Sequence, residues 1–214
     1  IAIKPGHVET HSNLGTALRD LGKLNEAEAS HRKSLQLHSS FAAGHYNLHP
    51  FLLDPGDMEA SIKCMQKAVE FDPESTNYRF YLGMLLDYSG KSRDAKTHFD
   101  LVESGANPGR EKLDAWRYIK SANDKIPLMV GSSFEGFKIG IEAAKNDGLV
   151  LEFGVRFGTT IHQIAAIVNQ EVHGFDSFEG LPDKWHNEPK GSYSTKGVIP
   201  SVQENVILHS GWFE

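Results

Sequence analysis

The 214-residue sequence has a single cysteine, Cys64, and this excludes an intrachain disulfide framework. One thiol in a chain of this length is typical of proteins of a reducing compartment. The sequence also lacks the run of about 18 apolar residues that a membrane-spanning helix needs, and it shows no signal-peptide pattern. We therefore expect a cytoplasmic protein without a membrane span.

An excess of basic residues is absent as well. The chain has 22 Lys and Arg against 28 Asp and Glu, a formal net charge of −6, and a pI near 6.0. Nucleic acids and anionic membranes bind surfaces that concentrate positive charge. We predict neither kind of partner.

Histidine is frequent, with 11 residues, but it forms no metal motif. His7 and His11, like His45 and His49, lie four apart, which could place both rings on one face of a helix. Neither pair comes with the glutamate of an HExxH zinc motif. We predict no metal site within this chain.

The first half of the chain repeats every 34 residues. The shift aligns leucines and glycines, namely Leu14 with Leu48 and Leu82, Leu18 with Leu52 and Leu86, and Gly22 with Gly56 and Gly90. This period and these residue types resemble the tetratricopeptide (TPR) repeat, a pair of antiparallel helices. Small residues such as Gly15 and Gly83 would let the two helices of a repeat approach closely.

Three such repeats account for residues 1–108. Pro73 closes the second repeat, and Pro5 occupies the same phase, which predicts the tail of another repeat before the first. In the second repeat His49 replaces the small residue of the first helix. Pro50 removes a helical hydrogen bond, so we expect this helix to bend or to end early.

The resemblance to TPR domains implies a protein or peptide partner bound on the first helices of the repeats. The third repeat would offer Asn77, Phe80, Met84, Asp87 and Tyr88 to that partner. Of the clamp residues that chaperone-binding TPR domains use, only Asn47 is present. We therefore expect a partner other than a chaperone tail.

Residues 109–147 are predicted to be capping and linking helices. The first, 110–123, would cover the open end of the repeats. Its apolar positions are Leu113, Trp116, Tyr118 and Ile119. The second, 134–145, is amphipathic and would pack on a following sheet.

Residues 149–158, LVLEFGVRFG, predict a buried strand that ends in a glycine loop. The near-continuous apolar run is typical of a parallel strand covered on both faces. Gly154 and Gly158 suit a tight turn into a helix, which Thr159 or Thr160 could cap. This is how a Rossmann-type domain begins its cofactor site.

The spacing of the loop disfavours a dinucleotide. A GxGxxG fingerprint counted from Gly154 would need glycines where the chain has Arg156 and Thr159. An arginine side chain prevents the close approach of the backbone to a pyrophosphate. The form E-x-G-x-x-x-G resembles the first motif of class I S-adenosylmethionine (SAM) methyltransferases, and a plain strand-to-helix turn is the alternative interpretation.

A second predicted strand, 171–176, ends in Asp176, where a carboxylate can accept hydrogen bonds from ribose hydroxyls. It continues into DSFEGLPDKW, and a third strand at 206–209 lies within ENVILHSGWFE. Together with LEFGVRFGTT these segments resemble the macrocin O-methyltransferase-like family of SAM-dependent enzymes. The resemblance covers roughly residues 148–214.

The resemblance implies six cofactor-binding residues, which are Glu152, Gly154, Gly158, Asp176, Ser177 and Trp212. The first three would surround the methionine part of SAM, Asp176 would hold the ribose, and Ser177 would shape the wall beside it. Trp212 would pack near the adenine, with ordinary core packing as its alternative.

The resemblance also implies more strands than the three that precede Glu214, so residues 148–214 are expected to be the N-terminal half of the domain. Ile1 in place of methionine suggests that the other end is cut too. In the family, a divalent metal and its acidic ligands assist catalysis further along the chain. We therefore name no catalytic residue, and we expect the incomplete sheet to form a homo-oligomer.

These observations predict an α + α/β protein, in which a TPR α-solenoid precedes an incomplete Rossmann-like parallel sheet. The function expected is that of a fragment of a SAM-dependent O-methyltransferase with an N-terminal TPR protein-interaction domain. This chain is expected to be inactive alone. The alternative is a TPR scaffold, a binding module with no catalytic activity.

Overall fold

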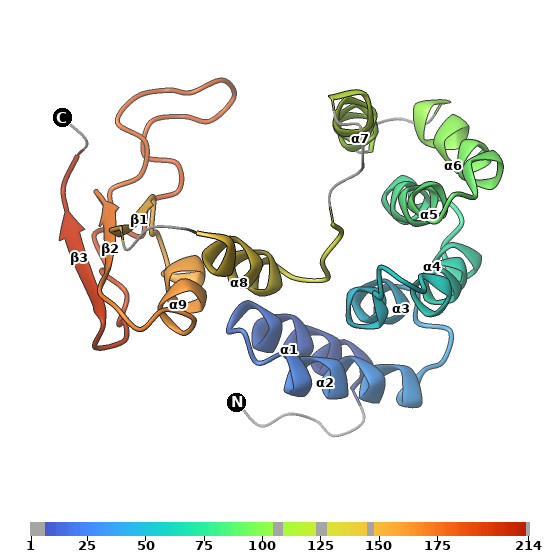
Figure 1. The fold of residues 1–214 in the computed structure, drawn as a ribbon, viewed down its shortest axis with the longest axis horizontal. Helices are drawn as coiled ribbons and strands as arrows, with labels where there is room; N and C mark the ends of the chain where they lie inside the picture. The colour runs from blue at the N-terminus through green and yellow to red at the C-terminus, as the bar shows by residue number, and fades with distance from the viewer. Residues whose placement is uncertain (1–6, 105–108, 123–127, 145–147, 213–214) are drawn as a thin grey trace. The chain divides into compact units, whose positions relative to one another are not determined.

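The computed structural model describes residues 7–104, 109–122, 128–144 and 148–212. It divides into two compact units, one from residues 1–19 and 23–132 and the other from residues 20–22 and 133–214. The described part of the first unit is helical, and the second unit carries a parallel sheet (Figure 1). Helical repeats followed by a small parallel sheet confirm the predicted α + α/β fold class.

Seven α-helices and one 3-10 helix make up the described part of the first unit. They are α1 (Val8–Asp20), α2 (Leu24–Leu37), α3 (Ala42–Leu48), η1 (His49–Leu52), α4 (Glu59–Phe71), α5 (Thr76–Tyr88), α6 (Ser92–Ser104) and α7 (Arg110–Ala122). The turns at Gly22 and Gly90 have φ angles of 74° and 82°, a left-handed conformation that glycine adopts at little cost. The breaks near these glycines confirm the 34-residue register.

Glycine also allows the two helices of a repeat to touch. A Cβ atom on Gly15 would lie 2.6 Å from the ring of His31, and one on Gly83 would lie 2.7 Å from the ring of Phe99. Both distances are shorter than real Cβ contacts, so any larger residue would separate the helices. The predicted close approach at these two glycines is confirmed.

The second repeat departs from the pattern as Pro50 predicts. Helix α3 ends at Leu48, and η1, which contains Pro50, takes the place of its last turn. His49 is 5% exposed and fills the position where the other repeats have glycine. The hydroxyl of Ser61 on α4 donates to the His49 carbonyl at 3.0 Å, which fixes the altered turn on the next helix.

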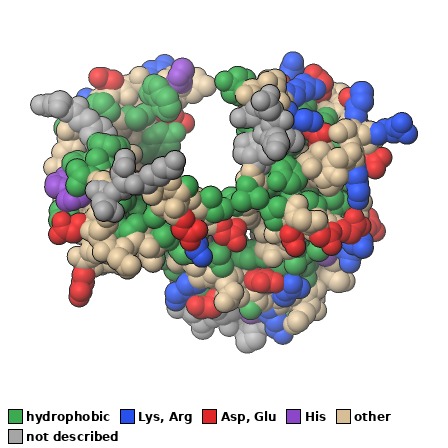
Figure 2. Space-filling model, viewed as in Figure 1, with side chains coloured by type: hydrophobic (Ala, Val, Ile, Leu, Met, Phe, Trp, Pro, Cys, Tyr) green, Lys and Arg blue, Asp and Glu red, His purple; other side chains and the backbone are tan. Residues whose placement is uncertain are grey.

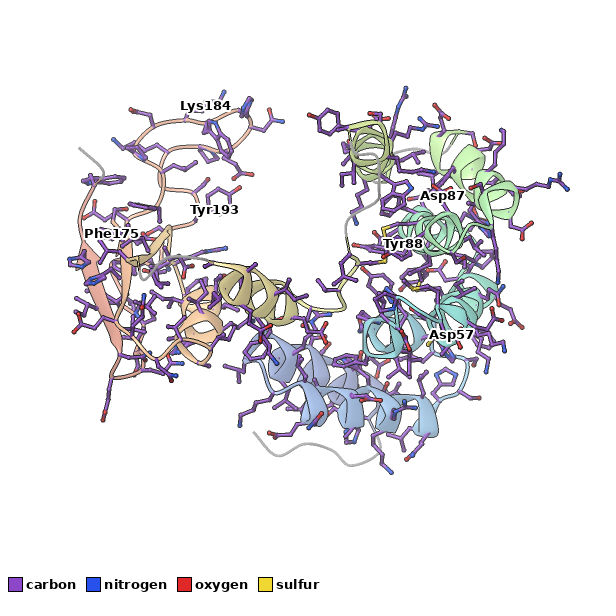
Figure 3. All side chains as sticks on the ribbon, in the orientation of Figure 1. Asp57, Asp87, Tyr88, Phe175, Lys184 and Tyr193 are labelled. Carbon is purple, nitrogen blue, oxygen red and sulfur yellow. The ribbon has the colours of Figure 1, made fainter. Side chains whose placement is uncertain are left out.

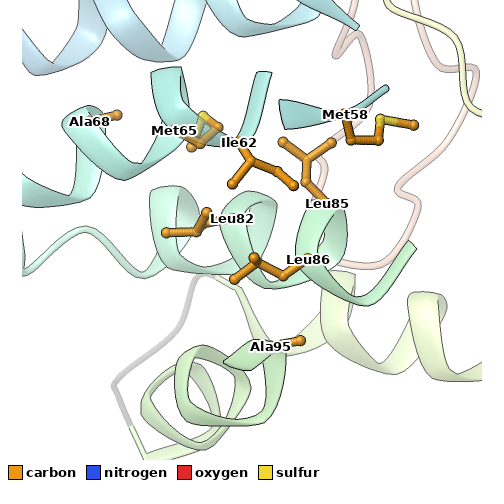
Figure 4. Close-up of a cluster of buried hydrophobic side chains, with 8 residues drawn as sticks. All are labelled: Met58, Ile62, Met65, Ala68, Leu82, Leu85, Leu86 and Ala95. Carbon is orange, nitrogen blue, oxygen red and sulfur yellow. The ribbon is translucent and has the colours of Figure 1, made fainter. Parts of the chain in front are cut away.

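The core of the first unit runs between α4 and α5 (Figure 4). Its buried members are Met58, Ile62, Met65, Ala68, Leu82, Leu85, Leu86 and Ala95. A second cluster joins Leu113 and Trp116 of α7 to Phe80 and Val102. Helix α7 thus covers the last repeat as expected, but Tyr118 and Ile119 are 72% and 38% exposed, so their predicted part in the cap is wrong.

The second unit contains three parallel strands and two helices among its described residues. The elements are α8 (Ser133–Ala143), β1 (Val150–Phe153), α9 (Thr159–Ala165), β2 (Val172–Asp176) and β3 (Val206–Ser210). The strand order is β1-β2-β3, and Val150, Val172 and Val206 pair in register across the sheet. In this order each strand lies beside its neighbour in sequence.

Helix α9 contributes to the core of this unit: Ile161 is fully buried and clusters with Val172 and Val206. On the other face Phe153 and Ile207 remain 65% and 38% exposed. The prediction that the first strand is covered on both faces is therefore wrong for the described residues. Its apolar run marks an exposed side of the sheet instead.

Candidate functional site

The carboxyl ends of β1 and β2 carry the predicted loops. Gly154 has a φ of 94° and donates its N–H to the Phe175 carbonyl at 2.8 Å, which extends the strand pairing by one residue. Gly158, with a φ of 82°, is the N-cap of α9 and makes no side-chain capping bond. The prediction that Thr159 or Thr160 caps this helix is wrong, because the helix already begins at Thr159.

Asp176 holds the two loops together. Its Oδ2 accepts the N–H of Arg156 at 2.8 Å, and its Oδ1 accepts the N–H of Phe178 at 2.6 Å. Arg156 has a φ of 52°, a conformation that costs a non-glycine residue about 1–2 kcal/mol, and the charge-assisted hydrogen bond offsets part of that cost. Each carboxylate oxygen can accept a further hydrogen bond.

The side chain of Arg156 connects the first loop to a longer one. Its guanidinium carbon lies 4.8 Å from the ring centroid of Phe157 and 5.5 Å from that of Tyr193. Cations over aromatic rings are attracted by the ring quadrupole. Tyr193 belongs to the segment 177–205 that joins β2 to β3, so this contact ties that segment to the glycine loop.

The β2–β3 segment is compact near the sheet. Phe178 is 1% exposed, and its carbonyl accepts the N–H groups of Thr195 and Gly197 at 3.2 and 3.1 Å. A Cβ atom on Gly180 would lie 2.4 Å from the Ser192 carbonyl oxygen, so the two arms of the segment are in direct backbone contact. These contacts give the segment a defined shape although it contains no helix.

A pocket of about 460 Å³ lies at this edge of the sheet, within the volume range of small-molecule sites. Its lining residues are Gly154, Arg156, Asp176, Ser177, Gly180, Leu181, Pro182, Tyr193, Gly211 and Trp212. Four of the six predicted cofactor-binding residues are thus brought together, whereas Glu152 and Gly158 lie outside the lining. Figure 3 labels Tyr193, which lines the pocket from the β2–β3 segment.

Glu152 lies beside this pocket with an unusual carboxyl group. Its Oε2 is buried and has no hydrogen-bond partner among the described residues. Burial, and then the negative charge of Asp176, raise the pKa of Glu152 to about 7. An uncompensated buried carboxyl of this kind is characteristic of binding and catalytic sites.

Several lining residues of the pocket were not predicted from the sequence. Leu181 and Pro182 belong to the DSFEGLP segment and could have been included on that ground. Tyr193 follows no motif, and only the fold of the segment brings it to the pocket. Arg156, which disfavours a pyrophosphate, also organises the loop through its N–H bond to Asp176 and its contacts with Phe157 and Tyr193.

No group of three or more His, Cys, Asp or Glu residues could hold a metal ion within the described ranges. No helix in the described part of the chain is both long and apolar enough to span a membrane. On the face drawn in Figure 2, basic and acidic side chains are interspersed over the helices.

Comparison with known families concerns the helical unit. The tetratricopeptide repeat model matches residues 8–39 and 52–75. This match agrees with the 34-residue register and with the paired helices of the first unit. No curated protein gives a match to the chain. TPR repeats are typical protein-interaction modules, and the first unit is interpreted as one.

Proposed function

We propose that the pocket at the carboxyl ends of β1 and β2 binds SAM, and that the chain is part of a SAM-dependent O-methyltransferase with an N-terminal TPR protein-interaction domain. The observation that carries the proposal is the pair of acids at this edge. Glu152 has a buried oxygen without a partner, and Asp176 lines the adjoining pocket. In open parallel sheets, ligands bind at this edge.

The two acids and the tryptophan at this edge fit the chemistry of SAM. The unpaired carboxyl of Glu152 suits the ammonium group of the methionine part, because a buried carboxylate is stabilised by a cation. Asp176 keeps lone pairs that can accept from the ribose hydroxyls. Trp212 is 42% exposed at the pocket and offers a ring face to the adenine.

SAM supplies an activated methyl group, which in such enzymes is transferred to an acceptor oxygen. The role of these residues is to bind and orient the donor, which is how enclosed sites accelerate in-line displacements. We assign no catalytic base.

The alternative function is a TPR scaffold without catalytic activity. It is favoured by the family match, which covers the helices and not the sheet. The two functions differ in one measurable property, since only the first requires the second unit to bind SAM or its product.

We expect SAM to bind this chain and the affinity to depend on both acids. Calorimetric or NMR titration should show weak binding that Glu152→Gln and Asp176→Asn each reduce by about 5- to 150-fold, the equivalent of 1–3 kcal/mol for an unpaired buried group. Because Glu152 has a pKa of about 7, its carboxylate becomes more populated between pH 6 and 7.5. Affinity for the ammonium group should therefore rise over that interval, and it should not do so in Glu152→Gln.

The matched control is Asp183→Ala, which removes an exposed carboxylate of the β2–β3 segment. It should bind SAM as the unaltered chain does. Circular dichroism of each variant separates a lost site from a lost fold. Absence of binding at millimolar SAM by a folded chain would contradict the SAM site proposed for this chain, and absence of binding by a version extended beyond Glu214 would leave the TPR scaffold.

We also propose that the exposed face of the sheet pairs with a second copy. Phe153, Phe175 and His209 form a stacked row across this face, with ring centroids 5.1 and 4.5 Å apart. Leu151 and Ile207 extend it and are 41% and 38% exposed. Contiguous apolar surface of this kind is typical of interfaces.

Sedimentation velocity tests this association. The unaltered chain should sediment as a dimer or larger species, and Phe153→Lys should shift it to the monomer because a charge would be buried at the interface. Tyr118→Lys alters an aromatic residue of α7 that is 72% exposed, against 65% for Phe153, and should leave the association unchanged. A monomeric unaltered chain at 100 µM would contradict the proposal.

A further inference from the structure

The first helices of the second and third repeats present a continuous group of aromatic side chains. This aromatic face comprises Tyr46 of α3 and Tyr78, Tyr81, Met84 and Tyr88 of α5, all partly buried. The ring centroid of Tyr46 lies 5.0 Å from that of Tyr78 and 5.4 Å from that of Tyr81. Such amphipathic rings contribute large contact area at a low entropic cost, which favours a binding surface.

Two residues predicted for this face lie elsewhere. Phe80 is 5% exposed and packs in the cluster with Leu113 and Trp116. Asp87 is 8% exposed, and its carboxylate accepts the indole N–H of Trp116 at 2.9 Å. Both serve the attachment of α7, so the surface available to a partner is narrower and more aromatic than the sequence suggested.

One residue from outside the helices packs against the same two buried clusters as Tyr81, Met84 and Tyr88 of this face. The α4–α5 core and the α7 cluster share five partly buried neighbours, which are Tyr81, Met84, Tyr88, Phe99 and Met129. The first four belong to α5 and α6. Met129 belongs to the non-helical segment 128–132 that follows α7 in Figure 1, and it is therefore inserted where the two clusters meet.

Met129 packs as the side chain of a bound peptide would. A thioether beside aromatic rings gains about 0.3–1.5 kcal/mol, and its flexibility lets it fill an irregular recess. Leu128, its neighbour, is 58% exposed and takes no part in the core. Met129 and Val130 are half-buried, so the segment turns these side chains inward and leaves Leu128 in solvent.

We propose that the aromatic face is the partner-binding surface of the TPR unit and that segment 128–130 occupies it in the free chain. The partner would present a non-helical segment whose unbranched apolar side chain, methionine or leucine, takes the place of Met129. This rests on the protein-interaction part of the proposed function and is independent of SAM. A tethered segment has an effective concentration in the millimolar range, so a partner must displace it.

Methyl NMR tests the occupancy directly. The chain has four methionines, and the ε-methyl of Met129 should be shifted by the ring currents of Tyr81 and Tyr88. In Met129→Asp the segment should leave the face, because a carboxylate cannot be buried there unpaired. The ε-methyl of Met84 should then move, whereas in Leu128→Asp, the matched control, both resonances should stay.

Binding in trans tests the surface. The probe is a fluorescent peptide with the sequence of residues 124–134. It should bind Met129→Asp at least tenfold more tightly than the unaltered chain or Leu128→Asp, and a peptide carrying aspartate in place of the methionine should bind none of them. Within Met129→Asp, a Tyr81→Ala change should remove the binding, and circular dichroism should confirm that the helices remain folded.

Three outcomes would overturn the proposal. The first is equal affinity of the peptide for the unaltered chain and for Met129→Asp. The second is no binding of the peptide by the folded Met129→Asp variant. The third is a dimer of the unaltered chain that Met129→Asp converts to monomer, because that result would place the segment on a second copy. The SAM titration has its own readout, so failure here leaves the cofactor proposal intact.

Discussion

Lowering the pH from 7 to 5 is expected to reduce the unfolding free energy of the helical unit by about 4 kcal/mol, through two buried histidines. His31 is fully buried, and neither ring nitrogen has a hydrogen-bond partner among the described residues. His49 is 5% exposed. Burial, above all, lowers the pKa of each from 6.5 to about 4, and the nearby positive charge of Arg19 lowers both further.

The sign follows from where the protons bind. Between pH 6.5 and 4 the unfolded chain protonates these rings and the folded chain does not, so acid favours unfolding. For a pKa of 4 in the folded and 6.5 in the unfolded state, the loss between pH 7 and 5 is about 2 kcal/mol for each ring. The unfolding free energy of a typical domain is about 5–15 kcal/mol in total.

Urea unfolding of the unaltered chain and of His31→Phe at the two pH values tests this expectation. Phenylalanine is the residue that faces glycine in the third repeat, where Phe99 packs on Gly83. The variant should lose about half of the pH dependence and gain stability at pH 7, because the unpaired ring nitrogens disappear. His38→Gln, at an exposed position, is the control. An unchanged pH slope in His31→Phe would contradict the assignment.

Asp87→Ala is expected to destabilise the attachment of α7 by about 2–4 kcal/mol. The carboxylate, labelled in Figure 3, accepts hydrogen bonds from Trp116 at 2.9 Å, Lys120 at 2.6 Å and Ser92 at 2.8 Å. Burial raises its pKa, but these three hydrogen bonds outweigh burial and hold the pKa below its usual value. Removing the carboxylate leaves the buried indole N–H without its acceptor.

Denaturant unfolding and amide exchange of α7 measure the effect. Asp87→Asn keeps one acceptor oxygen and should cost roughly half as much stability. Asp94 is an exposed acid on α6, and Asp94→Ala should stay within about 0.5 kcal/mol of the unaltered chain. Protection of the α7 amides should fall in Asp87→Ala before that of α4. Equal stability of Asp87→Ala and Asp94→Ala would show that the three hydrogen bonds do not hold the helix.

Local rules explain why the repeats were predictable. Each TPR helix pair is specified by residues close in sequence, so Gly15 and Gly83 reveal the close contacts and Pro50 reveals the shortened α3. The capping helix was predicted from the same periodicity. Its exact face follows the i, i+3 spacing of Leu113 and Trp116, and Tyr118, five positions after Leu113, falls on the exposed side.

The candidate site was predictable where strands end and not where loops fold. An acid or a glycine that follows an apolar run lies at the carboxyl edge of a parallel sheet, and Gly154, Asp176 and Ser177 meet there. Tyr193 comes from a segment without periodicity, whose path is decided by backbone contacts such as that of Gly180 with Ser192.

The sequence by itself determined the repeat length, the positions of the turns, the order of strands and helices, and the acids at the strand ends, because each depends on a few neighbouring residues. The tertiary structure alone decided which groups lose water. Burial left Glu152 and His31 without partners, gave Asp87 three donors, and brought Met129 against the α4–α5 core and the α7 cluster. Burial depends on contacts between segments far apart in the chain, and local patterns carry no record of them.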